Sequence, residues 1–114
     1  PTKGNVDQTL ELRAEDGSKT TARFSRKISE GHSSFAVVGE LPRLLKATSY
    51  EVWGLQREPY RIMSLGAMVE RTDGKYGLVF ESAEDMRGYE EMFITLEKDK
   101  DDPAPGEKVL EGKF

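Results

Sequence analysis

The sequence alternates between apolar and polar residues with a period of two along most of its length. In TARFSRKIS, residues 21–29, Phe24 and Ile28 fall on the same side of an extended strand, with Arg26 between them. Side chains alternate across a β-strand, whereas a helix repeats every 3.6 residues. The pattern therefore predicts an all-β domain.

About eight short strands are expected, most of about 5 to 9 residues. They fall at residues 7–13, 21–29, 34–41, 48–55, 60–70, 75–81, 91–98 and 107–114. The segment SFAVVGEL is apolar on both faces, which suits a central strand. Regularly spaced short strands with glycine turns between them predict an antiparallel β-sandwich, Ig-like or of a related Greek-key type.

Turn-forming residues separate these segments. Asp16-Gly17 and Asp73-Gly74 lie between alternating segments and predict two hairpins. Longer turns are expected at residues 30–33 and 102–106, where glycine and proline interrupt the alternation.

The best candidate for a helix is SAEDMRGYEE, residues 82–91. Ser82 is placed to cap its first turn, with Asp85 three positions later. Gly88 limits it to a turn or two, so a short helical connection is predicted. The segment after Pro42, Arg-Leu-Leu-Lys, is a second candidate for a single turn.

Composition narrows the class of protein. A chain of 114 residues fits a single domain, and its 33% charged residues predict a heavily charged surface. The net charge of −4 argues against nucleic acid and anionic membranes as main partners, including at the aromatic and basic segment LQREPYRIM. The absence of cysteine excludes disulfides and thiolate chemistry. No apolar run approaches the roughly 20 residues of a membrane span, but the chain begins at Pro1 and is interpreted as a piece of a longer protein.

A catalytic site is not predicted. His32 is the only histidine, and a Ser-His-Asp hydrolase would need it as the base, with Ser33, Ser34 or a distant serine as the nucleophile. No G-x-S-x-G motif occurs, and His32 is interpreted as an exposed turn residue.

A metal or cofactor site is not predicted either. The acidic run DKDD, residues 99–102, is a candidate calcium loop because hard oxygen ligands suit that ion. Asp99 and Asp101 alternate, but Pro103 then ends the pattern before a central glycine and a distal glutamate. A solvated hairpin tip is the favoured interpretation.

The most aromatic stretch is YEVWGLQREPYRIMSLGAM, residues 50–68, which contains the only tryptophan. It fits either a ligand platform or two core strands joined by a turn. Alternation places Tyr50 with Val52 on one face and Trp53 with Leu55 on the other. A strand with large apolar groups on both faces favours the structural interpretation.

Three segments carry a resemblance to a known family, and one of them, FAVVGELPRL at residues 35–44, resembles that family's strand leading into a Leu-Pro pair. LPRLLKATSYEVWGLQREPYRIMSLGAM resembles the Leu-Pro, Tyr-x-x-Trp and Leu-Gly series of the C-terminal domain of the anti-sigma-K factor family. FITLEKDKDDPAPGEKVLEGKF resembles that family's ending, with Thr-x-Glu, a polar turn, proline and glycine, and a last apolar strand. The resemblance covers residues 35–114. Ten signature residues carry it, each with an expected structural role: Leu41, Pro42, Tyr50, Trp53, Leu65, Gly66, Thr95, Glu97, Pro105 and Gly106.

The resemblance implies a single-pass membrane regulator. In such proteins a cytoplasmic N-terminal region holds an extracytoplasmic-function sigma factor, and a β-sandwich-like domain lies outside the bacterial plasma membrane. A signal that triggers cleavage by membrane proteases frees the sigma factor. The present chain would be the non-catalytic outer domain, which responds to an unidentified signal or ligand and needs no cofactor.

Two alternatives come from other classes of protein. One is an extracellular Ig- or fibronectin-like module that binds carbohydrate or a protein partner, with surface aromatics such as Tyr60 and Tyr89 as contacts. The other is a small hydrolase built on His32. A membrane span upstream, beside a sigma-factor gene, would favour the anti-sigma hypothesis, whereas repeated modules or an attached glycosidase would favour the binding module.

The structural interpretation of Trp53 is testable. Replacing it by alanine is expected to lower the free energy of unfolding by about 3–5 kcal/mol, because a large buried ring is lost. Urea unfolding followed by circular dichroism measures this change. Unchanged stability together with loss of a binding activity would instead support a ligand platform.

Overall fold

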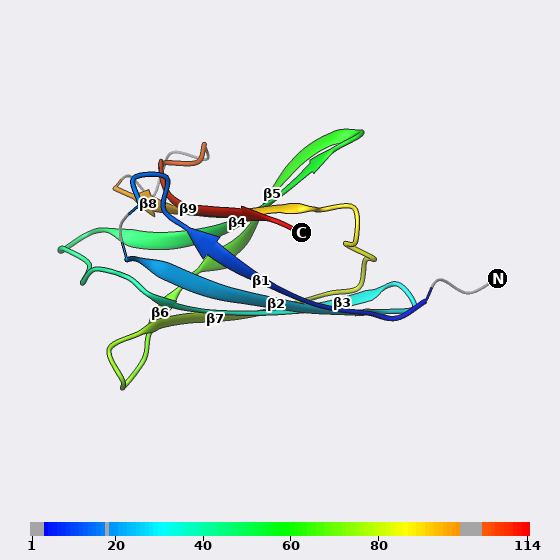
Figure 1. Cartoon of the computed structure of the whole chain (residues 1–114), viewed down its shortest axis with the longest axis horizontal. Helices are drawn as coiled ribbons and strands as arrows, with labels where there is room; N and C mark the ends of the chain where they lie inside the picture. Colours follow the sequence, from blue (N-terminus) through cyan, green and yellow to red (C-terminus); the bar gives the residue numbers. More distant parts are fainter. Residues whose placement is uncertain (1–3, 18, 99–103) are drawn as a thin grey trace.

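The computed structural model describes residues 4–17, 19–98 and 104–114. The strands are β1 (Val6–Arg13), β2 (Thr21–Ser29), β3 (His32–Glu40), β4 (Ser49–Arg57), β5 (Tyr60–Ala67), β6 (Val69–Glu70), β7 (Tyr76–Ser82), β8 (Glu91–Glu97) and β9 (Glu107–Lys113) (Figure 1). All the pairings between them are antiparallel. The all-β prediction is confirmed.

The nine strands form one sheet in the order β5-β4-β8-β9-β1-β2-β3-β7-β6. The sheet folds over so that the half containing β4, β5, β8 and β9 faces the half containing the other strands (Figure 1). The predicted sandwich of two sheets is not confirmed, because β1 pairs with both β2 and β9 and so joins the two halves. That seam is narrow, with Arg13 opposite Glu111 as its register pair. The result is a nearly closed, barrel-like sheet.

The other side of the barrel is closed by the chain itself. β5 and β6 lie at opposite ends of the strand order but are consecutive in sequence. The single strand expected at residues 60–70 is therefore divided at Met68, whose N–H donates to the Tyr50 carbonyl at 2.8 Å. Gly66 has a φ of 128°, a backbone conformation that residues with a Cβ rarely adopt. The chain bends there and leaves β4 to pair with β7.

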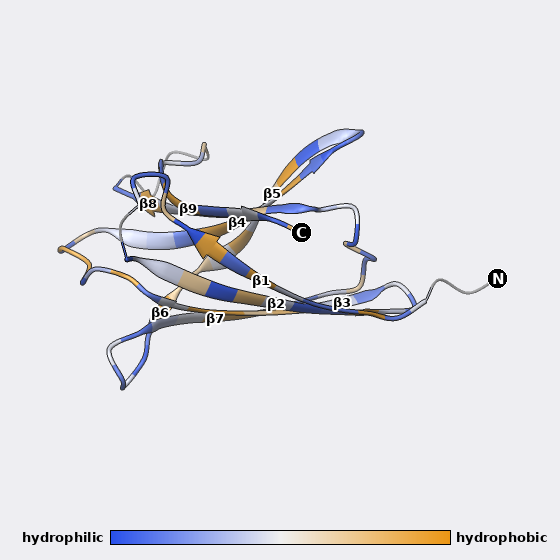
Figure 2. Cartoon of the chain, in the orientation of Figure 1, coloured by the Kyte–Doolittle hydropathy of each residue, from blue (hydrophilic) through white to orange (hydrophobic). Residues whose placement is uncertain are grey.

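The main core lies between the two halves and follows the period of two. In β2, Ala22, Phe24, Arg26 and Ile28 are buried while the residues between them are more exposed. Figure 2 shows this alternation as successive bands of different hydropathy along β1 and β2. The rings of Phe24 and Phe35 pack with centroids 5.4 Å apart.

Strand β4 is apolar on both faces, as its sequence indicates. Tyr50 and Val52 belong to the main core. Trp53 and Leu55 form a second, smaller cluster with Phe93 of β8, and the Trp53 and Phe93 rings stack with centroids 6.2 Å apart. Trp53 is 6% exposed, which supports the structural interpretation of the aromatic stretch over the platform interpretation.

Both predicted Asp-Gly hairpin turns are present. Gly17 and Gly74 have φ values of 74° and 82°, and the Gly74 N–H donates to the Arg71 carbonyl at 3.1 Å. The turn expected at residues 30–33 is shorter than predicted, because Glu30 and Gly31 alone make it, and His32 is the exposed first residue of β3. Of the turn expected at 102–106, residues 102 and 103 lie outside the described part of the chain, as does the DKDD run.

Neither predicted helical turn is observed. Residues 83–90 form an irregular loop between β7 and β8, and the Ser82 hydroxyl accepts a hydrogen bond from the Glu84 N–H at 3.1 Å without starting a helix. In a helix the carbonyl groups would point along the helix axis and accept hydrogen bonds from the helix itself. Here several of them accept hydrogen bonds from side chains of other strands. After Pro42 the chain makes only a tight turn at 46–47, where Ala47 has a φ of 64°.

In the part of the chain that the structure describes, there is no helix of the length and apolarity that crossing a membrane requires.

The narrow β1–β9 seam generates a prediction about Gly112. A Cβ at this position would lie 2.9 Å from Leu12 Cδ2 and 3.2 Å from the Glu11 carbonyl oxygen, and Leu12 is fully buried. Gly112→Ala is therefore expected to lower the free energy of unfolding by about 1–3 kcal/mol through overpacking, measured by urea unfolding. The neighbouring exposed variant Lys113→Ala should stay within about 0.5 kcal/mol of the parent, and equal stabilities of the two variants would contradict this account.

Candidate functional site

The structure shows which groups most of the ten signature residues contact. Leu41 and Tyr50 are buried in the main core, and the Tyr50 hydroxyl donates to the Pro42 carbonyl at 2.7 Å. This bond fastens the loop between β3 and β4 onto the start of β4. Leu65 is also buried, and Gly66, next to it on β5, is the register partner of Val52 on β4, the strand that carries Tyr50 and Trp53.

Four signature residues form one polar chain. The indole Nε1–H of Trp53 donates to Thr95 Oγ1 at 2.8 Å, and the Thr95 hydroxyl donates to Glu97 Oε2 at 2.5 Å. The Gly106 N–H donates to the same carboxylate oxygen at 2.6 Å. Thr95 and Glu97 are both buried. The carboxylate therefore joins the end of β8 to the residue that precedes β9.

Gly106 has no room for a side chain. A Cβ there would lie 2.5 Å from the Leu96 carbonyl oxygen and 2.8 Å from Glu97 Oε2. The adjacent Pro105 is exposed. The signature residues with described contacts thus pack the core or brace loops. The resemblance implied a structural role for them without showing these partners.

A cleft of about 570 Å³ opens at the same end of the barrel. The turn between β1 and β2, the loop between β3 and β4, and the facing ends of β8 and β9 form its walls. Leu45 is 80% exposed at this cleft, and Arg43 and Glu107 contribute charges of opposite sign. The cleft has apolar walls and a mixed rim, which suits an amphipathic ligand better than a strongly charged one.

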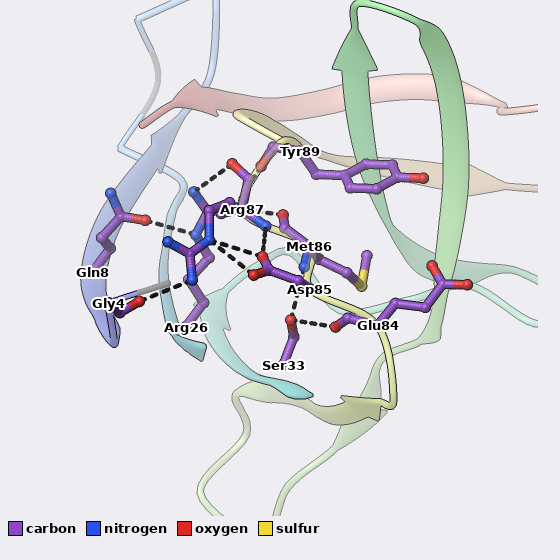
Figure 3. Close-up of polar contacts among 9 residues, drawn as sticks. All are labelled: Gly4, Gln8, Arg26, Ser33, Glu84, Asp85, Met86, Arg87 and Tyr89. Carbon is purple, nitrogen blue, oxygen red and sulfur yellow. Dashed lines mark hydrogen bonds and ion pairs between the residues drawn. The ribbon is translucent and has the colours of Figure 1, made fainter. Parts of the chain in front are cut away.

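The opposite end of the barrel is closed by a buried arginine, shown in Figure 3. Arg26 projects inward from β2 and is 2% exposed. Its guanidinium donates to the carbonyls of Met86 at 3.2 Å, Tyr89 at 2.6 Å and Arg87 at 3.4 Å. Its Nε–H also donates to Gln8 Oε1 of β1 at 2.7 Å.

Electrostatics at Arg26 follow from this burial. Desolvation lowers the pKa of the guanidinium from its ordinary value, Arg87 lowers it further, and the charges of Glu90 and Asp85 oppose the shift. Arginine nevertheless stays protonated in proteins. Arg26 is thus a permanent buried cation whose hydrogen bonds to loop carbonyls replace lost water.

Ser33 completes the attachment of the loop. It is fully buried, and its hydroxyl donates to the Glu84 carbonyl at 2.7 Å while accepting from the Met86 N–H at 2.9 Å. The hydrolase hypothesis considered this hydroxyl as a nucleophile, but both of these bonds hold it to the backbone. His32 is exposed and, as the preceding strand residue, faces the other side of β3.

Sequence reasoning missed the role of Arg26, although a signal was present. Position 26 shares the inward face of β2 with Phe24 and Ile28, so a charged residue there must find buried partners. The prediction that Tyr89 is a surface contact is wrong, because this residue is only 3% exposed. Tyr60 is 64% exposed, as expected. Among the described residues, no three or more acidic or histidine side chains are grouped to hold a metal ion.

These contacts define a small all-β domain whose buried polar residues brace loops. The family model described as the C-terminal domain of anti-sigma-K factor RskA matches residues 3–109, and the chain belongs to this family. The match begins well upstream of residue 35, where the resemblance in the sequence starts, and it ends at residue 109, before the resemblance does. No curated protein and no solved structure matches the chain. Family membership supports a regulatory anti-sigma role with a sigma factor as the partner.

The bond between Tyr50 and Pro42 generates a prediction about pH. Burial, with a contribution from Tyr76, raises the pKa of the Tyr50 phenol because it disfavours the charged phenolate. The neutral hydroxyl therefore stabilises the fold below its ordinary pKa of about 10, and this contribution is lost as the pH rises through the higher folded-state pKa.

Tyr50→Phe is expected to lower the free energy of unfolding by about 0.5–1.5 kcal/mol at pH 7. The gap between the parent and the variant should narrow above about pH 10. Urea titrations at a series of pH values measure both effects, with Tyr60→Phe as an exposed control of the same chemistry. A gap that is absent at pH 7, or that widens in alkali, would contradict the assignment.

Proposed function

We propose that this chain is the extracytoplasmic regulatory domain of a single-pass bacterial membrane anti-sigma factor, which controls an extracytoplasmic-function sigma factor. The match of the family model to residues 3–109 is the observation that carries the proposal. In the full protein, a cytoplasmic region upstream binds the sigma factor, and regulated proteolysis by membrane proteases releases it. The domain itself is non-catalytic.

The direction of the chain suits this arrangement. Gly4 precedes β1 near the Arg26 end, whereas Ala14 and Glu15, which line the cleft, follow β1 at the other end. Eight residues of strand separate the two ends by about 25 Å. A domain that is tethered through its N-terminal side thus turns the cleft away from the tether.

Domain stability gives a route from signal to proteolysis. A domain of this size is stable by only about 5–15 kcal/mol, so the population of opened molecules responds to small changes. A ligand that binds the folded state adds RT ln(1 + [L]/Kd) to its stability and reduces the access of a protease. The cleft is the place where such a ligand fits.

A second candidate function is an extracellular binding module for carbohydrate or a protein partner. The cleft and the exposed Tyr60 favour it, since both offer apolar contact surface. The gene that encodes the full protein separates the two candidates. An upstream membrane span beside a sigma-factor gene supports the anti-sigma proposal, and a series of similar modules supports the binding module.

The proposal is tested in cells that carry the full-length protein and a reporter driven by its sigma factor. Ile94→Ala removes a fully buried core side chain and should cost about 2–5 kcal/mol. Cleavage of the protein and reporter output are both expected to rise in this variant. Val79→Ala, at a position 77% exposed, is the matched control and should leave both unchanged. Equal cleavage and equal output in the two variants would refute the proposal.

A further inference from the structure

The loop at residues 83–90 lies over the end of the barrel and connects β7 in one half to β8 in the other (Figure 1). It inserts two side chains into the main core, Met86 with no exposure and Tyr89 with 3%. The loop therefore closes this end of the core with these two side chains, although it contains no helix or strand.

The loop is held mainly by side chains that belong to other strands. One backbone bond is internal, from the Tyr89 N–H to the Met86 carbonyl at 3.0 Å. Arg26 of β2 and Ser33 of β3 bind four of its carbonyls and one of its N–H groups. Figure 3 shows these two side chains reaching the loop from the neighbouring strands. The closed position of the loop thus depends on few groups.

The same loop also binds the chain just before the first strand, β1, and just after the last strand, β9. Arg87 Nη2–H donates to the Gly4 carbonyl, just before β1, at 2.9 Å, while its Nε–H pairs with Asp85. The Phe114 N–H, just after β9, donates to the Glu90 carbonyl at 2.7 Å. The Phe114 ring centroid lies 4.0 Å from Arg26 Cζ.

The closed loop also contains a feature that favours opening. The Tyr89 hydroxyl is buried, and no hydrogen-bond partner for it is found among the described residues. A buried hydroxyl without a partner is costly, and opening would return it to water. By contrast, β1 pairs with β2, and β2 with β3, along nearly their full lengths through backbone bonds that do not involve the loop.

We propose that loop 83–90 is a latch, which opens while the sheet stays folded and thereby frees the chain at Gly4, where it enters the domain. Local opening of this kind is common where buried contacts are few. The inference rests on the proposed function, and it identifies the regulated step: latch opening at the tethered end exposes the entering chain to a protease. Global unfolding of the sheet is then unnecessary for release.

The first test is native-state hydrogen exchange on the purified 114-residue chain, followed by NMR. Ser33→Ala and Arg26→Gln are expected to speed exchange at the amides of Met86, Tyr89 and Phe114 by at least about tenfold. Amides in the middle of the β2–β3 pair should change by less than about twofold. Uniform acceleration at all amides, or no acceleration in the loop, would overturn the latch.

Matched controls make this test specific. Ser64→Ala, which changes an exposed serine in β5, is the control for Ser33→Ala and should leave exchange at these amides unchanged. Ile94→Ala should instead accelerate exchange throughout the sheet because it weakens the core. Arg87→Ala keeps the latch interior intact and should increase cleavage by a non-specific protease between Gly4 and Val6. Its control is the exposed Arg61→Ala, and equal cleavage of the two variants would count against the latch.

The second test uses the full-length protein and the sigma-dependent reporter. Ser33→Ala and Arg87→Ala are expected to raise reporter output several-fold without changing the urea midpoint by as much as Ile94→Ala does. If Ile94→Ala raises the output and both latch variants leave it unchanged, the latch is refuted and the proposed function stands. If all three variants, Ile94→Ala included, leave the output unchanged, the proposed function is refuted as well.

Discussion

Closure of the sheet is the constraint on which the rest of the structure depends. One side closes through the short β1–β9 pairing and the other through the crossing of the chain at residues 66–69. Neither closure uses a long ladder of hydrogen bonds, so packing inside the barrel must hold the two halves together. The buried rings of Phe24, Phe35 and Tyr50 supply much of that packing.

A barrel of this kind has two ends, and the molecule treats them differently. One end is filled by loop 83–90, which the buried guanidinium of Arg26 holds through hydrogen bonds. The other end retains a cleft beside the hydrogen bond between Tyr50 and Pro42. Hydrogen bonds to buried charged groups are stronger than neutral ones, but the charge is costly if a partner is lost. The closed end is therefore firm when intact and sensitive to the loss of a single contact, which suits a regulatory domain.

Much of the fold could be predicted from the sequence, because alternation and Asp-Gly turns are local signals. The strands, both of those hairpins and the two-faced character of β4 follow from such patterns. Sheet closure could not be predicted, since the division at Met68 depends on which strand β6 pairs with. The missing helix at 82–91 has a similar cause: Ser82 and Asp85 carry a helix signal, but Arg26, distant in sequence, binds the carbonyls that a helix would have used. The residue types at the signature positions were recognisable, whereas their partners, such as Glu97 with Gly106, required the structure.

The outer cluster of Trp53, Leu55 and Phe93 has a spectroscopic consequence. Trp53 is the only tryptophan, and it lies outside the main core with its indole N–H bound to Thr95. Its fluorescence therefore reports on the outer face of β4 and β8 rather than on the interior of the barrel. An opening confined to the Arg26 end would leave this emission unchanged, while separation of β4 from β8 would shift it. The chain thus carries an intrinsic optical probe that distinguishes local from global loss of structure.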